Sequence, residues 1–213
     1  MRLILIEGMP GAGKTTLAKR LCEFALHAGR GSEWHREESA DHPVHPRSLG
    51  VLKLEEDYAH RCLRSWQRFA DAAQSSNTLC ILEGSAFQST VRFLMEQERQ
   101  GMADYFRRFE EIVQPLQPAF IYLRPGNANS HSREISTHRG PEWANKVSAY
   151  VEQTAYARSH ELRGEEGMHR FWSDYAQLCD ALVKQLSIPV LRIPTSPGHE
   201  EQMFSESVAF LRI

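Results

Sequence analysis

The most constraining feature of this chain is a glycine-rich segment near its start, IEGMPGAGKTT, at residues 6–16. The spacing of Gly8, Gly13, Lys14 and Thr15 fits G-x-x-x-x-G-K-[ST], the phosphate-binding P-loop. Glycines permit positive φ angles, which aim successive backbone N–H groups into one concavity. An apolar run precedes the segment and an amphipathic stretch follows it. The pattern therefore predicts a strand, a phosphate-binding turn and a helix in succession.

The groups of this turn have distinct expected roles. The predicted nucleotide-binding residues are Gly8, Met9, Pro10, Gly11, Ala12, Gly13, Lys14, Thr15 and Thr16. The helix that follows adds its unpaired N–H donors and the positive end of its dipole. Lys14 is expected to contact the outer phosphates of ATP, and the hydroxyl of Thr15 to bind Mg²⁺. A glycine-rich turn that binds no ligand is the alternative interpretation.

Composition narrows the class of protein. A chain of 213 residues, of which 41% are hydrophobic and 24% charged, suits one globular domain. A formal net charge of −2 argues against a nucleic-acid surface, and no apolar run approaches the length of a membrane span or a signal peptide. Cys22, Cys62, Cys80 and Cys179 lie far apart, which suggests neither a redox pair nor a zinc cluster. A cytoplasmic location is expected.

Apolar and amphipathic segments alternate along the whole chain. Strands are predicted at 2–7, 33–36, 78–82, 119–123 and 188–193, and helices at 14–28, 54–74, 88–99, 102–114, 168–186 and after the last strand. This alternation indicates a three-layer α/β/α domain with a five-stranded parallel sheet. The polar helical stretch at about 127–160 is expected to form a lid. Residues 1–213 are expected to form one domain.

Glu83 closes the apolar run at 78–82. In an open parallel sheet the ligand lies outside the carboxyl ends of the strands, so this acid would lie beside the magnesium site if its strand neighbours the first. It could then hold magnesium through water, or accept a proton from an attacking hydroxyl. The alternatives are a solvated acid and a cap for the helix that starts near Gln88.

The loop after the second predicted strand concentrates acids and histidines. It carries Glu37, Glu38, Asp41, His42 and His45, and two prolines stiffen it. Because this loop should emerge on the ligand side of the sheet, we expect Glu37 or Glu38 to act as a catalytic base or to hydrogen-bond the substrate. A solvated loop is the alternative, and a transition-metal site at the histidines has little support.

A basic group follows the fourth predicted strand. It consists of Arg124, Arg133, His138, Arg139 and Lys146. Transfer of a γ-phosphoryl group needs mobile cations, which a closing lid usually supplies. Arg133 and Arg139 lie in the predicted lid, which Gly140 and Pro141 divide, and we expect one of these arginines to be catalytic. A solvated helix surface is the alternative.

With these residues in view, the chain resembles the nucleotide- and nucleoside-kinase branch of P-loop proteins. More narrowly, it resembles uncharacterised bacterial thymidylate-kinase-like ATP-binding proteins, through EESADHP, EGSAFQ, PAFIYL and RGPEW. The resemblance implies that the acidic loop lies near the phosphoryl acceptor, with Glu37, Asp41, His42 and Gln88 as substrate-binding residues. EGS replaces the Glu-Arg-Ser of deoxynucleoside kinases, and no Asp-Arg pair closes the third strand as in thymidylate kinases.

The favoured function is therefore magnesium-dependent transfer of the γ-phosphoryl group of ATP to a hydroxyl of a small molecule. The acceptor is either nucleoside- or nucleotide-like, or sugar- or antibiotic-like. The alternative is a P-loop ATPase or nucleotide-dependent switch without such an acceptor. The chain lacks the N-K-x-D motif of GTPases, and the intact Gly13-Lys14-Thr15 argues against a module that binds nucleotide without chemistry. The sequence is compatible with a homodimer.

Overall fold

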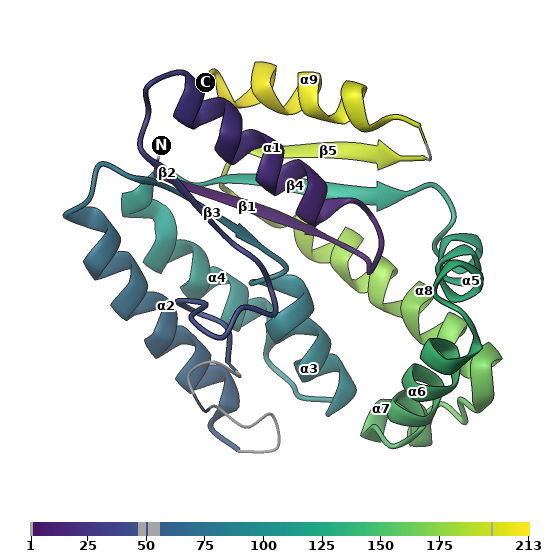
Figure 1. Cartoon of the computed structure of the whole chain (residues 1–213). Coiled ribbons are helices and arrows are strands. Elements are labelled where there is room, and N and C mark those ends of the chain that lie inside the picture. Colours follow the sequence, from purple (N-terminus) through teal and green to yellow (C-terminus); the bar gives the residue numbers. More distant parts are fainter. Residues whose placement is uncertain (1, 47–49, 51–55, 197) are drawn as a thin grey trace.

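The five predicted strands form one parallel sheet in the computed structural model, which describes residues 2–46, 50, 56–196 and 198–213. The strands are β1 (Leu3–Gly8), β2 (Ser32–His35), β3 (Leu79–Glu83), β4 (Ala119–Pro125) and β5 (Val190–Thr195). Their order across the sheet is β2-β3-β1-β4-β5, with every neighbouring pair parallel. The predicted three-layer α/β/α class with a five-stranded sheet is confirmed (Figure 1).

Helices cover both faces of this sheet. They are α1 (Lys14–His27), α2 (Tyr58–Gln74), α3 (Arg92–Glu96), α4 (Met102–Val113), α5 (Ala128–Arg139), α6 (Pro141–Glu152), α7 (Ala155–Ser159), α8 (Gly164–Val183) and α9 (Glu200–Leu211). Helices α1 and α9 lie on one face, and α2, α4 and α8 on the other (Figure 1). Because β1 lies between two strands and two helical layers, its residues are all buried, which explains its continuous apolar run.

Three helix predictions need correction. The segment predicted as one helix at 88–99 begins as a π-helical turn, η1 (Phe87–Val91), and continues as the short α3. The helix predicted at 168–186 already begins at Gly164. The helix predicted at 54–74 begins at Tyr58, and residues 54 and 55 lie outside the described residues.

A helical arm, defined here as α5 to α7, stands at the carboxyl edge of the sheet and packs against α8 (Figure 1). Asn127 caps its first helix, since the side-chain Oδ1 accepts a hydrogen bond from the backbone N–H of Ser130 at 2.9 Å. Helix α5 ends at Gly140, and α6 starts with Pro141, a residue well suited to the first turn of a helix. None of the described helices is long and apolar enough to cross a membrane.

Candidate active site

The P-loop connects the buried end of β1 to the N-terminus of α1. Gly8 has φ +155°, and a Cβ there would lie 2.5 Å from the carbonyl oxygen of Leu123 in the neighbouring strand. Only glycine therefore lets the loop leave the sheet at this point. Helix α1 then begins at Lys14, so its free N–H groups face the loop.

Lys14 lies at the centre of this loop and is 7% exposed. Its Nζ donates to the carbonyl oxygens of Gly8 at 3.2 Å and Met9 at 3.0 Å, and to the side-chain Oε1 of Gln88 at 2.6 Å. An ammonium group has three protons, so these three acceptors account for all of them. The fold therefore brings together Lys14 and Gln88, which are 74 residues apart in the sequence.

Thr15 and Glu83 form the second polar contact of the loop. The pairing of Ile6 with Glu83 places β3 beside β1, which is the condition under which Glu83 was expected to lie beside the P-loop. The hydroxyl of Thr15 donates to Glu83 Oε1 at 2.9 Å, and Glu83 is 2% exposed. Burial raises the pKa of Glu83, and the Thr15 hydrogen bond opposes that rise. The other oxygen, Oε2, is buried without a hydrogen-bond partner among the described residues.

Hydroxyl and carboxylate oxygens are the ligands that Mg²⁺ prefers, so Thr15 and Glu83 fit such an ion. The orphaned Oε2 of Glu83 supports this assignment, because a buried carboxylate oxygen normally has a partner. The described residues contain no cluster of three or more metal-ligating side chains. A magnesium ion here would therefore need waters and nucleotide phosphates to complete its coordination, as is usual for Mg²⁺.

Glu37 lies beside Glu83, across from Gly84. A Cβ at Gly84, which has φ +63°, would lie only 2.6 Å from Glu37 Oε2, so glycine permits this close approach. The backbone N–H of Glu37 donates to Glu83 Oε1 at 3.4 Å. Burial raises the pKa of the Glu37 carboxyl, while the charges of Lys14 and Arg92 oppose the rise. A carboxyl with a raised pKa close to the P-loop has the properties of a general base.

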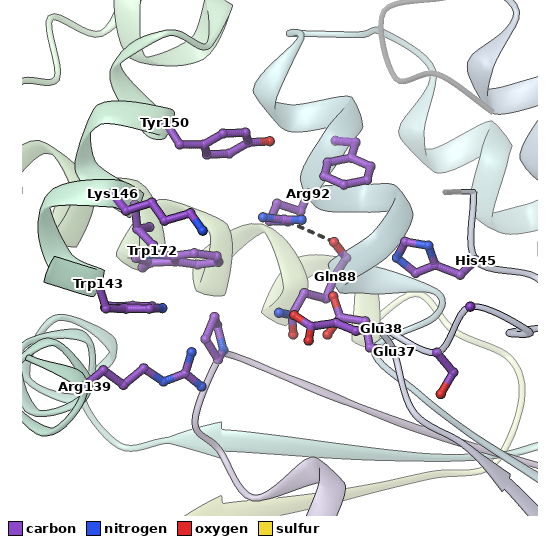
Figure 2. Close-up of a pocket in the computed structure, with 15 residues that line it drawn as sticks. Glu37, Glu38, His45, Gln88, Arg92, Arg139, Trp143, Lys146, Tyr150 and Trp172 are labelled. Carbon is purple, nitrogen blue, oxygen red and sulfur yellow. Dashed lines mark hydrogen bonds between the residues drawn. The ribbon is translucent and has the colours of Figure 1, made fainter. Parts of the chain in front are cut away.

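A cavity of about 700 Å³ opens next to these groups and is called here the acceptor-side cavity. Its lining is Pro10, Glu37, Glu38, Ser39, Ala40, His45, Gln88, Arg92, Phe93, Arg139, Trp143, Lys146, Val147, Tyr150 and Trp172. Figure 2 shows Glu37, Glu38 and Gln88 facing Trp143, Lys146 and Tyr150 across it. The volume suits a small molecule, and the aromatic and charged walls suit a ring with polar substituents.

A second cavity, of about 910 Å³, lies on the other side of the P-loop and is called here the nucleotide-side cavity. It is lined by Gly11 and Ala12 of the loop, by residues of α5, by Thr195 at the end of β5 and by Ser196 after it. His131 of α5 contacts the P-loop directly, with its Nε2 at 2.9 Å from the carbonyl oxygen of Pro10. Arg139 is the one described residue that lines both cavities.

The acceptor-side cavity is tied to the core through Arg92 and Glu96. Arg92 Nε donates to the carbonyl oxygen of Gln88 at 2.9 Å, and its Nη1 lies 3.6 Å from Glu96 Oε1. Tyr150 of the arm donates its hydroxyl to Glu96 Oε2 at 2.6 Å. This contact joins α6 to α3 across the cavity. Arg92 and Tyr150 were not predicted from the sequence, although Arg92 follows Gln88 by one helical turn.

Glu7 is a second residue that the sequence analysis missed. It is fully buried in β1, and its Oε1 accepts a hydrogen bond from the backbone N–H of Ala86 at 2.6 Å. Burial raises its pKa to about 8, although the Ala86 hydrogen bond acts in the opposite direction. Glu7 thus fixes the start of the π-helical turn that carries Gln88. The sequence did contain a feature that could have drawn attention to Glu7, because it is an acid inside an otherwise apolar strand, LILIEG.

The histidines of the acidic loop have structural partners. His42 is 1% exposed, and its Nδ1 accepts hydrogen bonds from the backbone N–H groups of Val44 at 3.2 Å and His45 at 2.9 Å. Its Nε2 therefore carries the proton and donates to Ser85 Oγ at 3.0 Å, and Ser85 donates to the carbonyl oxygen of Glu83 at 3.1 Å. Burial lowers the pKa of His42 to about 3. This neutral histidine anchors the loop to the end of β3.

The predicted basic residues separate into two sets. Arg139 lines both cavities and lies over the ring of Trp143, with its Cζ 4.9 Å from the ring centroid. Arg133 is exposed and forms a bidentate pair with Glu166 at 2.7 and 2.6 Å, outside the lining of either cavity. Arg124 pairs with Asp180 at 2.9 Å. The exposed Asp41 likewise lies outside the lining of the acceptor-side cavity.

No protein-family model matches the chain, and no curated protein sequence matches it. Its structure is similar to that of the YorR protein from Bacillus subtilis in complex with phosphorylated GDP, with a TM-score of 0.55 and 12% identity over 99% of this chain and 95% of that chain. It is also similar to thymidylate kinase from Candida albicans, with a TM-score of 0.52 and 13% identity over 99% and 91% of the two chains. At these identities the likeness establishes the fold alone, which is the three-layer α/β/α fold of P-loop NTPases.

Proposed function

We propose that the protein is a magnesium-dependent ATP phosphotransferase that acts on a hydroxyl of a small ring-containing molecule. One observation carries the proposal: two separate cavities flank the P-loop, and Arg139 lines both. A phosphotransferase needs a donor site and an acceptor site that meet at the transferred phosphoryl group. The fold shared with thymidylate kinase agrees with such a role. The four cysteines are buried free thiols, which suits the proposed setting in a reducing cytoplasm.

On the donor side, ATP would lie with its phosphates in the P-loop and its base in the nucleotide-side cavity. Lys14 and the N–H groups at the start of α1 would bind the outer phosphates. Thr15 and Glu83 would hold Mg²⁺, which neutralises charge on the β- and γ-phosphate oxygens when bound. Arg139 would contact the γ-phosphate, because its side chain lines both cavities.

On the acceptor side, the substrate ring would pack against Trp143 and the neighbouring aromatic walls. Glu37 would accept the proton of the attacking hydroxyl, because it lies beside Glu83 and lines the cavity. Glu38 would hydrogen-bond another hydroxyl or amine of the substrate. The reaction is then an in-line attack of the substrate hydroxyl on the γ-phosphorus, with ADP as the leaving group.

An ATPase that transfers the phosphoryl group to water is the competing function. It needs no second cavity with aromatic walls, whereas this chain has one of about 700 Å³ next to the P-loop. The two functions differ in what an added acceptor does to ADP release. A kinase is stimulated by its substrate, and an ATPase is not.

The test is ADP release with Mg²⁺ and ATP, measured without acceptor and with a panel of nucleosides, nucleoside monophosphates, sugars and aminoglycosides. Glu83→Gln should depress both basal and stimulated release, because it removes a magnesium ligand. Glu37→Gln should lower stimulated release about 100-fold or more, the usual contribution of a general base, and should lower basal release much less. Glu142→Gln, an exposed change in α6 outside the cavity lining, is the matched control.

Stimulation by one panel compound, lost in the Glu37 variant and kept in the Glu142 variant, supports the kinase. If no compound stimulates release, or if Glu37→Gln and Glu83→Gln lower basal release equally, the ATPase explanation is favoured.

A further inference from the structure

Three acceptors in the structure account for all three protons of the Lys14 ammonium group. Two of its acceptors are main-chain carbonyl oxygens of the P-loop, and the third is the side-chain Oε1 of Gln88 at 2.6 Å. Gln88 belongs to the π-helical turn η1 and lines the acceptor-side cavity. One amide side chain thus joins the predicted donor-site lysine to the wall of the other cavity.

A phosphate bound to Lys14 would compete with Gln88 for the same protons. Phosphate oxygens form charge-assisted hydrogen bonds, which are about twice as strong as bonds to a neutral amide. Since an ammonium group offers only three donors, a phosphate bound to Lys14 must displace an existing partner. The carbonyl groups of Gly8 and Met9 are fixed in the loop, whereas the Gln88 side chain can rotate about its single bonds.

We propose that Gln88 is an acceptor-binding group under the control of the donor nucleotide. In the structure, Lys14 donates a hydrogen bond to the side-chain oxygen of Gln88. When the phosphates of ATP take Lys14, Gln88 turns into the acceptor-side cavity and accepts a hydrogen bond from the substrate there. This role for Gln88 toward the substrate rests on the proposed function, whereas its release by phosphates rests on the contact with Lys14 alone.

The exchange makes the two binding events cooperative. ATP releases a polar group that a bound acceptor can use, and by linkage the acceptor favours ATP to the same degree. Ordered binding of ATP before the acceptor follows, because Gln88 is unavailable until Lys14 has a phosphate partner. Such an order limits the time for which the acceptor site is complete without its co-substrate.

The release is tested by nucleotide affinity in Gln88→Met, which keeps the length of the side chain and removes its hydrogen-bonding oxygen. The probes are a non-hydrolysable ATP analogue and AMP, each titrated calorimetrically with Mg²⁺. The variant should bind the ATP analogue about tenfold more tightly, since Lys14 no longer has to leave a hydrogen-bond partner. Its affinity for AMP should stay within about twofold, because the P-loop lysine contacts the β- and γ-phosphates.

Two controls make the outcome decisive. Gln97→Met, at the end of α3 and outside the acceptor-side cavity, should leave both affinities unchanged. In a Lys14→Met background, Gln88→Met should no longer affect binding of the ATP analogue. Thermal unfolding shows whether each variant is folded. If one single variant is unstable, the affinity for the ATP analogue is compared using the double variant Lys14→Met with Gln88→Met.

Unchanged or weaker binding of the ATP analogue by folded Gln88→Met overturns the exchange, as does an equal gain for AMP. These titrations contain no acceptor, so they separate this inference from the proposed function. If the acceptor panel fails while the nucleotide series behaves as expected, small-molecule phosphotransfer is rejected and release of Gln88 stands. If the panel succeeds and the series fails, the kinase stands and the exchange is wrong.

Discussion

Replacing Glu7 by glutamine should stabilise the protein by an amount that grows as the pH rises from 5.5 to 8. Glu7 is fully buried in β1, and burial raises its pKa to about 8 from an ordinary 4.5. The folded protein therefore keeps a proton that the unfolded chain loses above pH 4.5. Stability falls as pH rises whenever the folded state binds more protons, so Glu7 costs stability between about pH 4.5 and 8.

The size of the effect follows from the two pKa values of Glu7. Each difference of one pKa unit corresponds to about 1.36 kcal/mol, so the wild-type protein should lose about 3 kcal/mol through Glu7 between pH 5.5 and 8. Glutamine mimics the protonated carboxyl at every pH. Its side-chain oxygen keeps the hydrogen bond from the Ala86 N–H, and its NH₂ occupies the place of the buried Oε2.

The assay is urea unfolding of the wild-type protein and Glu7→Gln at several pH values from 5.5 to 8. Glu37 and Glu83 also have raised pKa values, but they contribute to both proteins and cancel in the difference. Glu23→Gln, an exposed change on α1, is the control and should follow the wild type. Parallel pH curves for wild type and Glu7→Gln would show that Glu7 is ionised in the folded protein and refute the reasoning.

Two further predictions concern turnover. Lys14→Ala should lower ATP turnover on the order of 100- to 1000-fold in a folded protein, the usual loss for one electrostatic contact to the transition state, and full activity would reject the P-loop assignment. Arg139→Ala should lower the turnover number far more than it weakens ATP binding, as measured by steady-state kinetics and titration, because Arg139 lines both cavities. Arg133→Ala should stay within about twofold of wild type, since Arg133 pairs with Glu166 on the surface, and equal losses in both variants would contradict this division.

The P-loop and the class of fold were readable from the sequence because each depends on neighbouring residues. The glycines, Lys14 and Thr15 act through local backbone geometry and through the start of one helix. Strands β1, β3 and β4 were recognisable because they are buried on both faces, which demands apolar runs. The π-helical turn at the start of the segment after β3 was not predictable from the sequence. Its pattern of apolar residues also suits an ordinary α-helix.

The partners of the site residues were decided by the tertiary structure. Glu83 reaches Thr15 only because β3 lies next to β1, and the sequence does not state the order of the strands. The role of Glu7 likewise depends on Ala86, which is 79 residues away in the sequence.

The tertiary structure also decides which of the two arginines in the arm, Arg133 or Arg139, faces the cavities. Arg133 and Arg139 are six residues apart on one helix, so at about 100° per residue they point in different directions. The sequence determines that angle, which ensures that both cannot face the P-loop. Packing of α5 against α8 and the contact of His131 with Pro10 turn Arg139 toward the cavities and Arg133 toward Glu166. These contacts join distant segments, and for that reason only the folded chain specifies them.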